Sequence, residues 1–252
     1  MNRKVAAIAI AIIVVGAGAV LLLLPRSADT FHLEKNLPEG NYTSVSFQLK
    51  DIQDCSLNVS FVDNPTLLYS MDIRLYTSSP VSTAFDLSVN GANLAQLDVE
   101  LDGKTRIKNI NLVLGSGVPY AIGVLGTNVN ATAIYSNNVV GSRASFDFQT
   151  TGSFVELRFT EDMVFTSEGM EVNVGTAGVG RPDAVYLSLN LPDGVNGIGS
   201  FSIPLSIHAN TGWTLYSQVG DSDTYVTENH NQQPRIGIAL RAVYSVHVWL
   251  SD

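Results

Sequence analysis

The sequence predicts an all-β body of stacked short strands, either a β-solenoid or a β-sandwich, behind one N-terminal transmembrane helix. From residue 42 onward apolar and polar residues alternate, as where Val45, Phe47 and Leu49 are separated by Ser46 and Gln48. A period of two places one set of side chains on one face of a strand. Asn-Gly and Asp-Gly pairs between such runs predict tight turns. No helical period of useful length follows residue 24.

The first segment is a run of twenty uncharged residues, Val5 to Leu24, which follows Arg3 and Lys4 and ends at Pro25 and Arg26. At about 1.5 Å per residue a helix of this length covers roughly 30 Å, the hydrocarbon thickness of a bilayer. Basic residues near a first span favour the cytoplasmic side, which predicts an inside N-terminus and an outside body. We therefore expect a single-pass cell-membrane protein that contacts the lipid bilayer through Val5 to Leu24.

A cleaved signal peptide is the competing interpretation, because it also has a basic start and an apolar core. Its apolar core usually runs about 7 to 15 residues, and the present run is longer. Arg26 also stands where a cleavage site needs a small side chain. Either interpretation exports the same body. The predicted organisation is an anchor over residues 1–26, a polar stalk over 27–40 and an exported all-β domain over 41–252.

Short strands at near-regular spacing fill the exported part. This spacing is typical of a sandwich or barrel, and equally of a solenoid whose rungs stack and bury a continuous core. The apolar closing run, Arg235 to Leu250, is expected to pair inside a sheet, because an exposed edge of this kind would aggregate. The other strands are predicted around Val45, at Leu57 to Val62, Leu68 to Tyr76, Phe85 to Val89 and Leu94 to Leu101, near Leu112, Ile122, Ile134, Phe146, Val155, Val164, Val172 and Leu187, and at Gly199 to His208 and Trp213 to Tyr216.

The charge of the chain is acidic, with a formal net charge of −9. Because Arg3, Lys4 and Arg26 belong to the anchor, eleven of the 14 basic residues remain in the exported part against 23 acidic ones. Such a balance repels phosphate backbones, so nucleic acid is not an expected partner. Cys55 is the only cysteine, which excludes an intrachain disulfide. Its alternation with Leu57 predicts a buried thiol in the core.

Three segments of the second half combine short apolar runs with glycine-containing turns: Leu112-Val-Leu-Gly-Ser-Gly-Val-Pro-Tyr, Val172-Asn-Val-Gly-Thr-Ala-Gly-Val-Gly and Leu187-Ser-Leu-Asn-Leu-Pro-Asp-Gly. They resemble the putative-adhesin family of prokaryotic surface proteins. The resemblance covers residues 109–250 and implies repetitive β-sheets of short strands, often behind an N-terminal membrane helix, together with an adhesive role. It supplies no catalytic residue.

No catalytic or cofactor-binding residue is predicted, and we do not expect an enzyme. The four histidines, His32, His208, His230 and His247, are scattered, and no Gly-x-Ser-x-Gly elbow surrounds a serine. The sequence has no His-x-x-x-His pair and no cysteine pair of the kind that zinc sites use. It also lacks the βαβ units on which a nucleotide-binding fold would be built.

Calcium is the one ion for which the sequence offers ligands. Asp193 and Asn196 stand at one predicted turn, and Asp221 and Asp223 at another. Carboxylate and amide oxygens from loops are the usual calcium ligands in proteins. Neither pair matches a full calcium loop, and both are equally typical of ordinary turns.

A glycan or protein ligand is predicted to bind exposed aromatic rings. Trp213, Tyr216 and Tyr225 lie beside the polar stretch Gly220 to Gln233, and amphipathic rings give a large contact area at low entropic cost. Packing of Trp213 in the core is the alternative interpretation.

The leading hypothesis for function is a membrane-anchored extracytoplasmic β-domain protein with a structural, adhesive or binding role at the cell surface. Two alternatives come from other classes. A pilin-like filament subunit would pack its apolar N-terminal helix into a filament core. An anchored glycan-active enzyme would need paired carboxylates, but neighbours such as Glu161 and Asp162 point to opposite faces of a strand.

Overall fold

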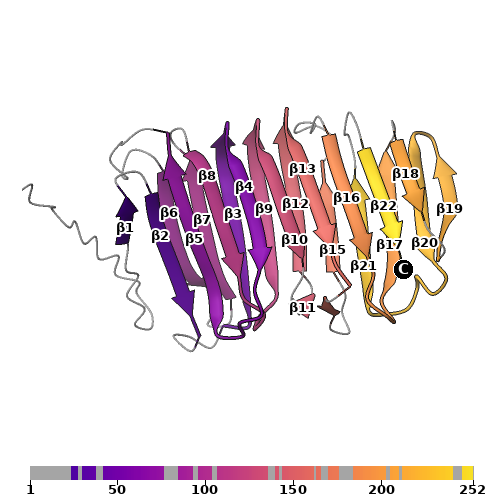
Figure 1. Cartoon of the computed structure of the whole chain (residues 1–252), viewed down its shortest axis with the longest axis horizontal. Helices are drawn as coiled ribbons and strands as arrows, with labels where there is room; N and C mark the ends of the chain where they lie inside the picture. Colours follow the sequence, from indigo (N-terminus) through magenta and orange to yellow (C-terminus); the bar gives the residue numbers. More distant parts are fainter. Residues whose placement is uncertain are drawn as a thin grey trace, which may run out of the picture.

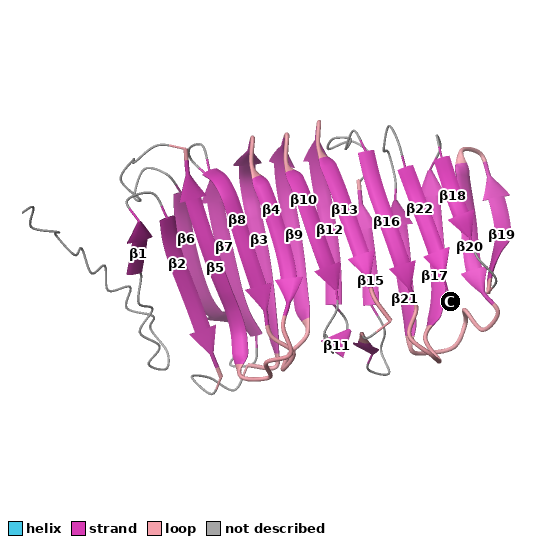
Figure 2. Ribbon diagram, viewed as in Figure 1, coloured by secondary structure: helices cyan, strands magenta, loops and turns pink. Residues whose placement is uncertain are grey.

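Two ten-stranded β-sheets, A and B, pack face to face and enclose one hydrophobic core (Figures 1 and 2). The computed structural model describes residues 24–27, 30–37, 42–76, 85–92, 96–103, 107–135, 140–141, 144–161, 163–165, 170–175, 184–202, 205–209, 212–240 and 246–251. Strands, turns and loops make up these residues, and no helix occurs among them. The all-β prediction is therefore confirmed for the described part of the chain.

The strand order in each sheet differs from the order along the chain. A two-stranded third sheet pairs β11 (Val140–Gly141) with β14 (Val164–Phe165). Sheet A runs in the order β1 (Leu24–Ser27), β2 (Thr30–Asn36), β5 (Leu67–Leu75), β8 (Ile107–Leu114), β4 (Ser56–Phe61), β10 (Asn130–Tyr135), β13 (Phe154–Phe159), β16 (Ala184–Asn190), β22 (Val246–Ser251), β18 (Leu205–Ala209). Sheet B runs in the order β19 (Trp213–Val219), β20 (Ser222–Thr227), β17 (Asn196–Ser202), β21 (Arg235–Leu240), β15 (Met170–Val174), β12 (Ala144–Thr151), β9 (Tyr120–Thr127), β3 (Ser44–Gln53), β7 (Gln96–Gly103), β6 (Phe85–Ala92).

The described central strands form seven rungs, each made of one strand of sheet B followed along the chain by one strand of sheet A. Neighbouring rungs pair in parallel in both sheets. Along the stack the rungs are β7/β8, β3/β4, β9/β10, β12/β13, β15/β16, β21/β22 and β17/β18. The body is thus a parallel solenoid whose two sheets face each other as in a sandwich, so each predicted architecture describes one aspect of it.

Antiparallel strands extend both ends of the solenoid. At one end sheet A continues through β5, β2 and β1, and sheet B continues through β6. At the other end sheet B continues through β20 and β19, whereas sheet A ends at β18. Figure 1 shows β1 and β19 at opposite ends of the long axis. The rungs β7/β8 and β21/β22 stand out of chain order, one near each end.

The core is built of columns in which each rung contributes a side chain at the same register position. In one column Phe61 of β4, Tyr135 of β10 and Phe159 of β13 are all buried. The centroid of the Tyr135 ring lies 4.7 Å from that of Phe61 and 4.8 Å from that of Phe159. These distances match the spacing of neighbouring strands in a sheet. The planes of Tyr135 and Phe159 are inclined by only 10°. Parallel register therefore converts the period-two pattern into continuous stacks of apolar side chains.

The single cysteine lies in this core. Cys55 precedes β4 and is 2% exposed, and its thiol donates a hydrogen bond to the carbonyl oxygen of Ser56 at 3.3 Å. Desolvation by burial raises the pKa of the Cys55 thiol to about 12. The thiol is therefore protonated at neutral pH and acts as an apolar side chain, as its position in the alternating pattern predicts.

Two buried tyrosines differ in whether their hydroxyl groups are hydrogen-bonded. The hydroxyl of Tyr120 donates to the carbonyl oxygen of Leu68 at 2.7 Å and accepts from the backbone N–H of Gly115 at 3.2 Å. The hydroxyl of Tyr69 has no hydrogen-bond partner among the described residues. Burial raises the pKa of both phenols, so both are protonated at neutral pH.

We expect Tyr120→Phe to lower the free energy of unfolding by about 1–2 kcal/mol, because it leaves a buried acceptor and a buried donor unpaired. Tyr69→Phe is expected to be neutral or slightly stabilising, because it removes an unsatisfied hydroxyl. Urea unfolding followed by circular dichroism measures both changes. Equal losses in the two variants would contradict this assignment of the hydroxyl partners.

The N-terminal region differs from the sequence-based expectation. Residues 27–40 were expected to form a stalk, yet β2 (Thr30–Asn36) pairs with β5 over its whole length and buries Leu33 completely. The stalk prediction is therefore wrong for Thr30–Asn36, because Phe31 and Leu33 supply an apolar face that sheet A buries. Leu24, the expected last residue of the transmembrane helix, begins β1. Residues 5–23, the rest of that helix, lie outside the described residues. Within the described part no helix could span a membrane.

The apolar segment Arg235 to Leu250 also differs from the sequence-based expectation. It was expected to form one strand, but it supplies β21 to sheet B and β22 to sheet A. Each of the two strands has a parallel neighbour on both sides: β15 and β17 flank β21, and β16 and β18 flank β22. The expectation that this segment pairs inside a sheet is thus confirmed. It is divided into two strands because each rung of the solenoid has one strand in each sheet, and β21 and β22 together form one rung.

Candidate functional site

The outer face of sheet A presents continuous rows of side chains that cross the strands. Register partners on neighbouring strands of a sheet lie side by side on the same face. Because seven parallel rungs share one register, a single row runs most of the length of the solenoid. From β2 to β22 its members are His32, Asp72, Asn111, Asn58, Thr132, Glu156, Tyr186 and His247. The row is polar at the N-terminal end and aromatic at the C-terminal end.

Three rings form the aromatic end of this face. The rings of Tyr186 and His247 stack with centroids 4.9 Å apart and planes inclined by 7°. The ring of Trp249 lies 6.4 Å from that of His247 at an inclination of 21°. Tyr186 is 39% exposed and Trp249 is 45% exposed. The cluster therefore presents an aromatic platform to solvent on the outer face of sheet A.

A shallow groove of about 540 Å³ runs beside the aromatic platform. Tyr186, Ser188 and Trp249 line it together with Glu156 and Arg158 of β13. Arg158 Nε donates to Glu156 Oε1 at 2.7 Å, and both side chains are partly exposed. An exposed ion pair of this kind contributes about 1 kcal/mol or less to stability. Its carboxylate and guanidinium instead provide hydrogen-bond acceptors and donors at the edge of the rings.

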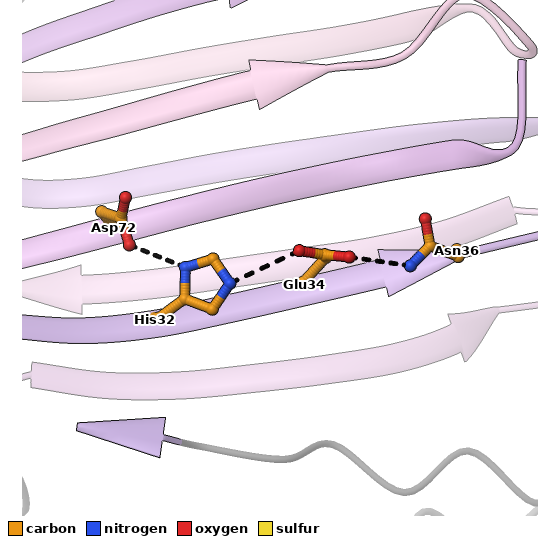
Figure 3. Close-up of polar contacts among 4 residues, drawn as sticks. All are labelled: His32, Glu34, Asn36 and Asp72. Carbon is orange, nitrogen blue, oxygen red and sulfur yellow. Dashed lines mark hydrogen bonds and ion pairs between the residues drawn. The ribbon is translucent and has the colours of Figure 1, made fainter. Parts of the chain in front are cut away.

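A second groove, of about 480 Å³, lies at the polar end of the same face. Thr30, Ser56, Asp72, Arg74, Tyr76, Lys108, Asn109 and Asn111 line it. His32 bridges two carboxylates here: its Nδ1 lies 2.7 Å from Asp72 Oδ1 and its Nε2 lies 3.5 Å from Glu34 Oε2 (Figure 3). Asn36 Nδ2 donates to Glu34 Oε1 at 2.9 Å. This chain of contacts along β2 fixes the carboxylate of Asp72 at the edge of the groove.

The two outer faces of the solenoid differ in charge. Among the described side chains, strands of sheet A carry Arg74, Lys108 and Arg158 outward, together with the acidic Glu34, Asp72 and Glu156. Strands of sheet B carry mostly acids. Among the described side chains these are Asp51, Asp98, Glu100, Asp102, Asp147 and Glu171, against Lys50 and Arg235. Among the described strand side chains, acidic groups are therefore concentrated on the face opposite the two grooves.

The aromatic patch predicted around residues 213–225 is only partly formed. Trp213 is 5% exposed and packs into the core, as in the alternative interpretation. A Cβ atom on Gly197 would lie 2.1 Å from the Trp213 ring, so glycine at that position makes room for the indole. Tyr225 also packs against the core. Tyr216, which is 65% exposed, contacts the ring of His230 with centroids 5.3 Å apart.

The calcium candidates fall into two separate places. Asn196 is the first residue of β17 and Asp193 lies in the turn before it; Asn196 Nδ2 donates to the carbonyl oxygen of Gln232 at 3.3 Å. Asp223 pairs with Phe201 near the other end of β17, and Asp221 precedes it in the turn before β20. The length of β17 separates the two pairs by roughly 15–20 Å. Within the described part of the chain no three His, Cys, Asp or Glu side chains form a metal-binding group, and the calcium site stays a prediction.

The aromatic platform was not singled out from the sequence, although a signal for it exists. Tyr186 stands between the buried Val185 and Leu187, and Trp249 between the buried Val248 and Leu250. A large aromatic residue in the polar phase of an alternating strand is expected to face solvent. Their proximity to each other could not be read from the sequence, because it depends on the pairing of β16 with β22.

Comparison with known proteins supports the fold. No protein-family model matches the sequence, and the search of curated proteins gives no match. Among solved structures, the chain is similar to a crystal structure described as a "putative cell adhesion protein" from Clostridium sporogenes. The TM-score is 0.53 at 12% sequence identity, and the alignment covers 87% of this chain and 98% of that chain. At this identity the similarity shows a shared fold.

Proposed function

We propose that the protein is a non-enzymatic adhesion protein of the cell surface that binds saccharides through the outer face of sheet A. The observation that carries this proposal is the platform of Tyr186, His247 and Trp249 on the outer face of sheet A, beside the Glu156–Arg158 pair. Aromatic rings with polar groups at their edges suit a sugar ring, which has apolar C–H faces and hydroxyl groups around its rim. The fold shared with a protein described as adhesive adds support.

The charge distribution and the N-terminal sequence support the same role. The acidic outer face of sheet B keeps the protein soluble and disfavours self-association through that face. In the proposal the apolar residues before β1 tether the body to the membrane, with the body on the extracytoplasmic side. The two grooves on sheet A then face the surroundings of the cell as one contiguous surface.

Replacing the two exposed rings tests the proposal. We expect full-length protein carrying Tyr186→Ser and Trp249→Ser to bind immobilised polysaccharides roughly 5- to 150-fold more weakly than the unchanged chain, because each ring contributes about 0.5–1.5 kcal/mol of stacking. The melting temperature should change by about 2 °C or less, since both side chains are exposed.

The matched control is Tyr216→Ser, which removes an exposed tyrosine from β19 at the end of sheet B. It should leave binding unchanged. Wild-type affinity in the double variant, or an equal loss in the Tyr216→Ser protein, would refute the proposed binding face. Biolayer interferometry on a panel of neutral and acidic polysaccharides provides the measurement.

A further inference from the structure

We infer that the polar groove at the other end of sheet A is a second subsite on the same saccharide chain, where Arg74 and Lys108 bind a carboxylate or sulfate group of the sugar. The ligand is then an acidic polysaccharide that lies along the long axis of the solenoid and crosses the strands. This inference rests on the proposed function, because the aromatic platform holds the other end of the chain.

The geometry comes from the parallel register. Asp72, which lines the polar groove, and Tyr186, which lines the aromatic groove, belong to the same row of register partners. Between β8 and β16 the row crosses β4, β10 and β13, so the grooves are roughly 20 Å apart at the usual strand spacing. An extended chain that follows the row contacts both grooves without bending.

The surface between the grooves suits sugar hydroxyl groups. Asn58 and Asn111 lie side by side in the row, and Asn58 Nδ2 donates to Asn111 Oδ1 at 2.8 Å. This bond orders both amides, and each amide has more than one donor and acceptor position. Thr132 continues the row next to Asn58. A polar and ordered strip therefore connects the two subsites.

Charge selects an anionic group at the polar end. Arg74 and Lys108 both line the groove, whereas Asp72 is the one carboxylate among its lining residues. The contact of Asp72 Oδ1 with His32 holds that carboxylate toward β2. Guanidinium and ammonium groups form strong charge-assisted hydrogen bonds with carboxylates and sulfates. The acidic outer face of sheet B repels the same ligand, which directs it to sheet A.

The experiment compares two polymers with the same sugar backbone, one with free carboxylates and one with uncharged methyl esters. Polygalacturonate carries a carboxylate on every sugar, and its fully methyl-esterified form carries none. Isothermal titration calorimetry of the full-length protein in detergent measures the affinity for each polymer. The same measurement is made with short and with long fragments of each. The variant is Arg74→Gln with Lys108→Gln. The control, Lys50→Gln, removes a lysine from the outer face of sheet B.

The unchanged protein should bind long polygalacturonate at least tenfold more tightly than the methyl ester. The Arg74→Gln/Lys108→Gln protein should lose this preference, and the Lys50→Gln protein should keep it. Long fragments should also bind more tightly than trimers, because a second contact on one chain raises the effective concentration. That gain should disappear both in the Arg74→Gln/Lys108→Gln protein and in the Tyr186→Ser/Trp249→Ser protein.

Three results would overturn the inference. Equal affinity for acid and ester would show that no anionic group is recognised. If the Arg74→Gln/Lys108→Gln protein still bound long fragments more tightly than trimers, the polar groove would not contact the saccharide chain that the aromatic platform binds. In both cases weaker binding by the Tyr186→Ser/Trp249→Ser protein would leave the proposed function intact. Unchanged binding by that protein would overturn the proposed function together with the inference.

Discussion

Gly115→Ala is expected to lower the free energy of unfolding by about 3 kcal/mol or more, because the added methyl group would meet main-chain atoms. Gly115 follows β8 and lies against the loop between β4 and β5. A Cβ atom there would be 2.0 Å from the carbonyl oxygen of Leu67 and 2.5 Å from that of Asn64. Rotation of a side chain cannot relieve these contacts. The loop would have to move, which would disturb the N-terminal end of sheet A.

Gly237→Ala is the matched control for Gly115→Ala. Gly237 lies within β21, and the nearest atom to an added Cβ is 3.9 Å away. Its free energy of unfolding should change by about 1 kcal/mol or less, with a gain expected from the reduced freedom of the unfolded chain. Guanidinium unfolding followed by circular dichroism compares the two. Similar stabilities of both variants would contradict the close approach of the loop to Gly115.

Tyr135→Ala is expected to cost about 3–5 kcal/mol, the usual loss for an aromatic side chain in a core. Tyr135 is fully buried and stands between Phe61 and Phe159 in the aromatic column. The cavity would interrupt the stack in the middle of the solenoid, at rung β9/β10. Because each rung contacts only its neighbours, such a gap also weakens the coupling between the two halves.

The unfolding curve should report both effects. The transition of the Tyr135→Ala protein should shift to lower denaturant concentration and should become broader, as the halves unfold less cooperatively. Tyr216→Ala, at an exposed ring, should lie within about 0.5 kcal/mol of the unchanged protein. A loss below about 1 kcal/mol for Tyr135→Ala would show that the column does not hold the rungs together.

The sequence predicts which residues face the core, but it does not predict which strands are neighbours. The alternation of Val45, Phe47 and Leu49 with polar residues correctly predicts that all three are buried. The face on which a side chain lies can be read from the alternating pattern of its own strand alone. The pairing of strands cannot be read in this way, because nearly every rung has the same alternating pattern and therefore offers the same apolar face to its neighbours. The position of β7/β8 outside β3/β4 depends on contacts between residues about fifty positions apart.

Two local features explain the remaining errors. In β2, Lys35 occupies an inward position that the apolar pattern reserves for a hydrophobic side chain, and this interrupts the period. Lys35 is 4% exposed, and its Nζ lies over the ring of Tyr42 at 5.0 Å from the centroid. In the candidate site, Trp213 follows Gly212 and precedes Thr214, so no alternation of apolar residues indicates which way it faces. The space above Gly197 allows Trp213 to be buried, whereas Trp249 lies in the polar phase of β22 and is exposed.

The insertion of β21/β22 between β15/β16 and β17/β18 makes completion of the fold depend on a segment that follows all of these strands in the sequence. Without β21 and β22, β17 has only the hairpin strand β20 beside it, and β18 has no neighbouring strand among the described residues. A chain that emerges from the ribosome in sequence order therefore leaves this end of the solenoid incomplete until β21 and β22 are synthesised. These two strands close it by pairing with a strand on each of their sides.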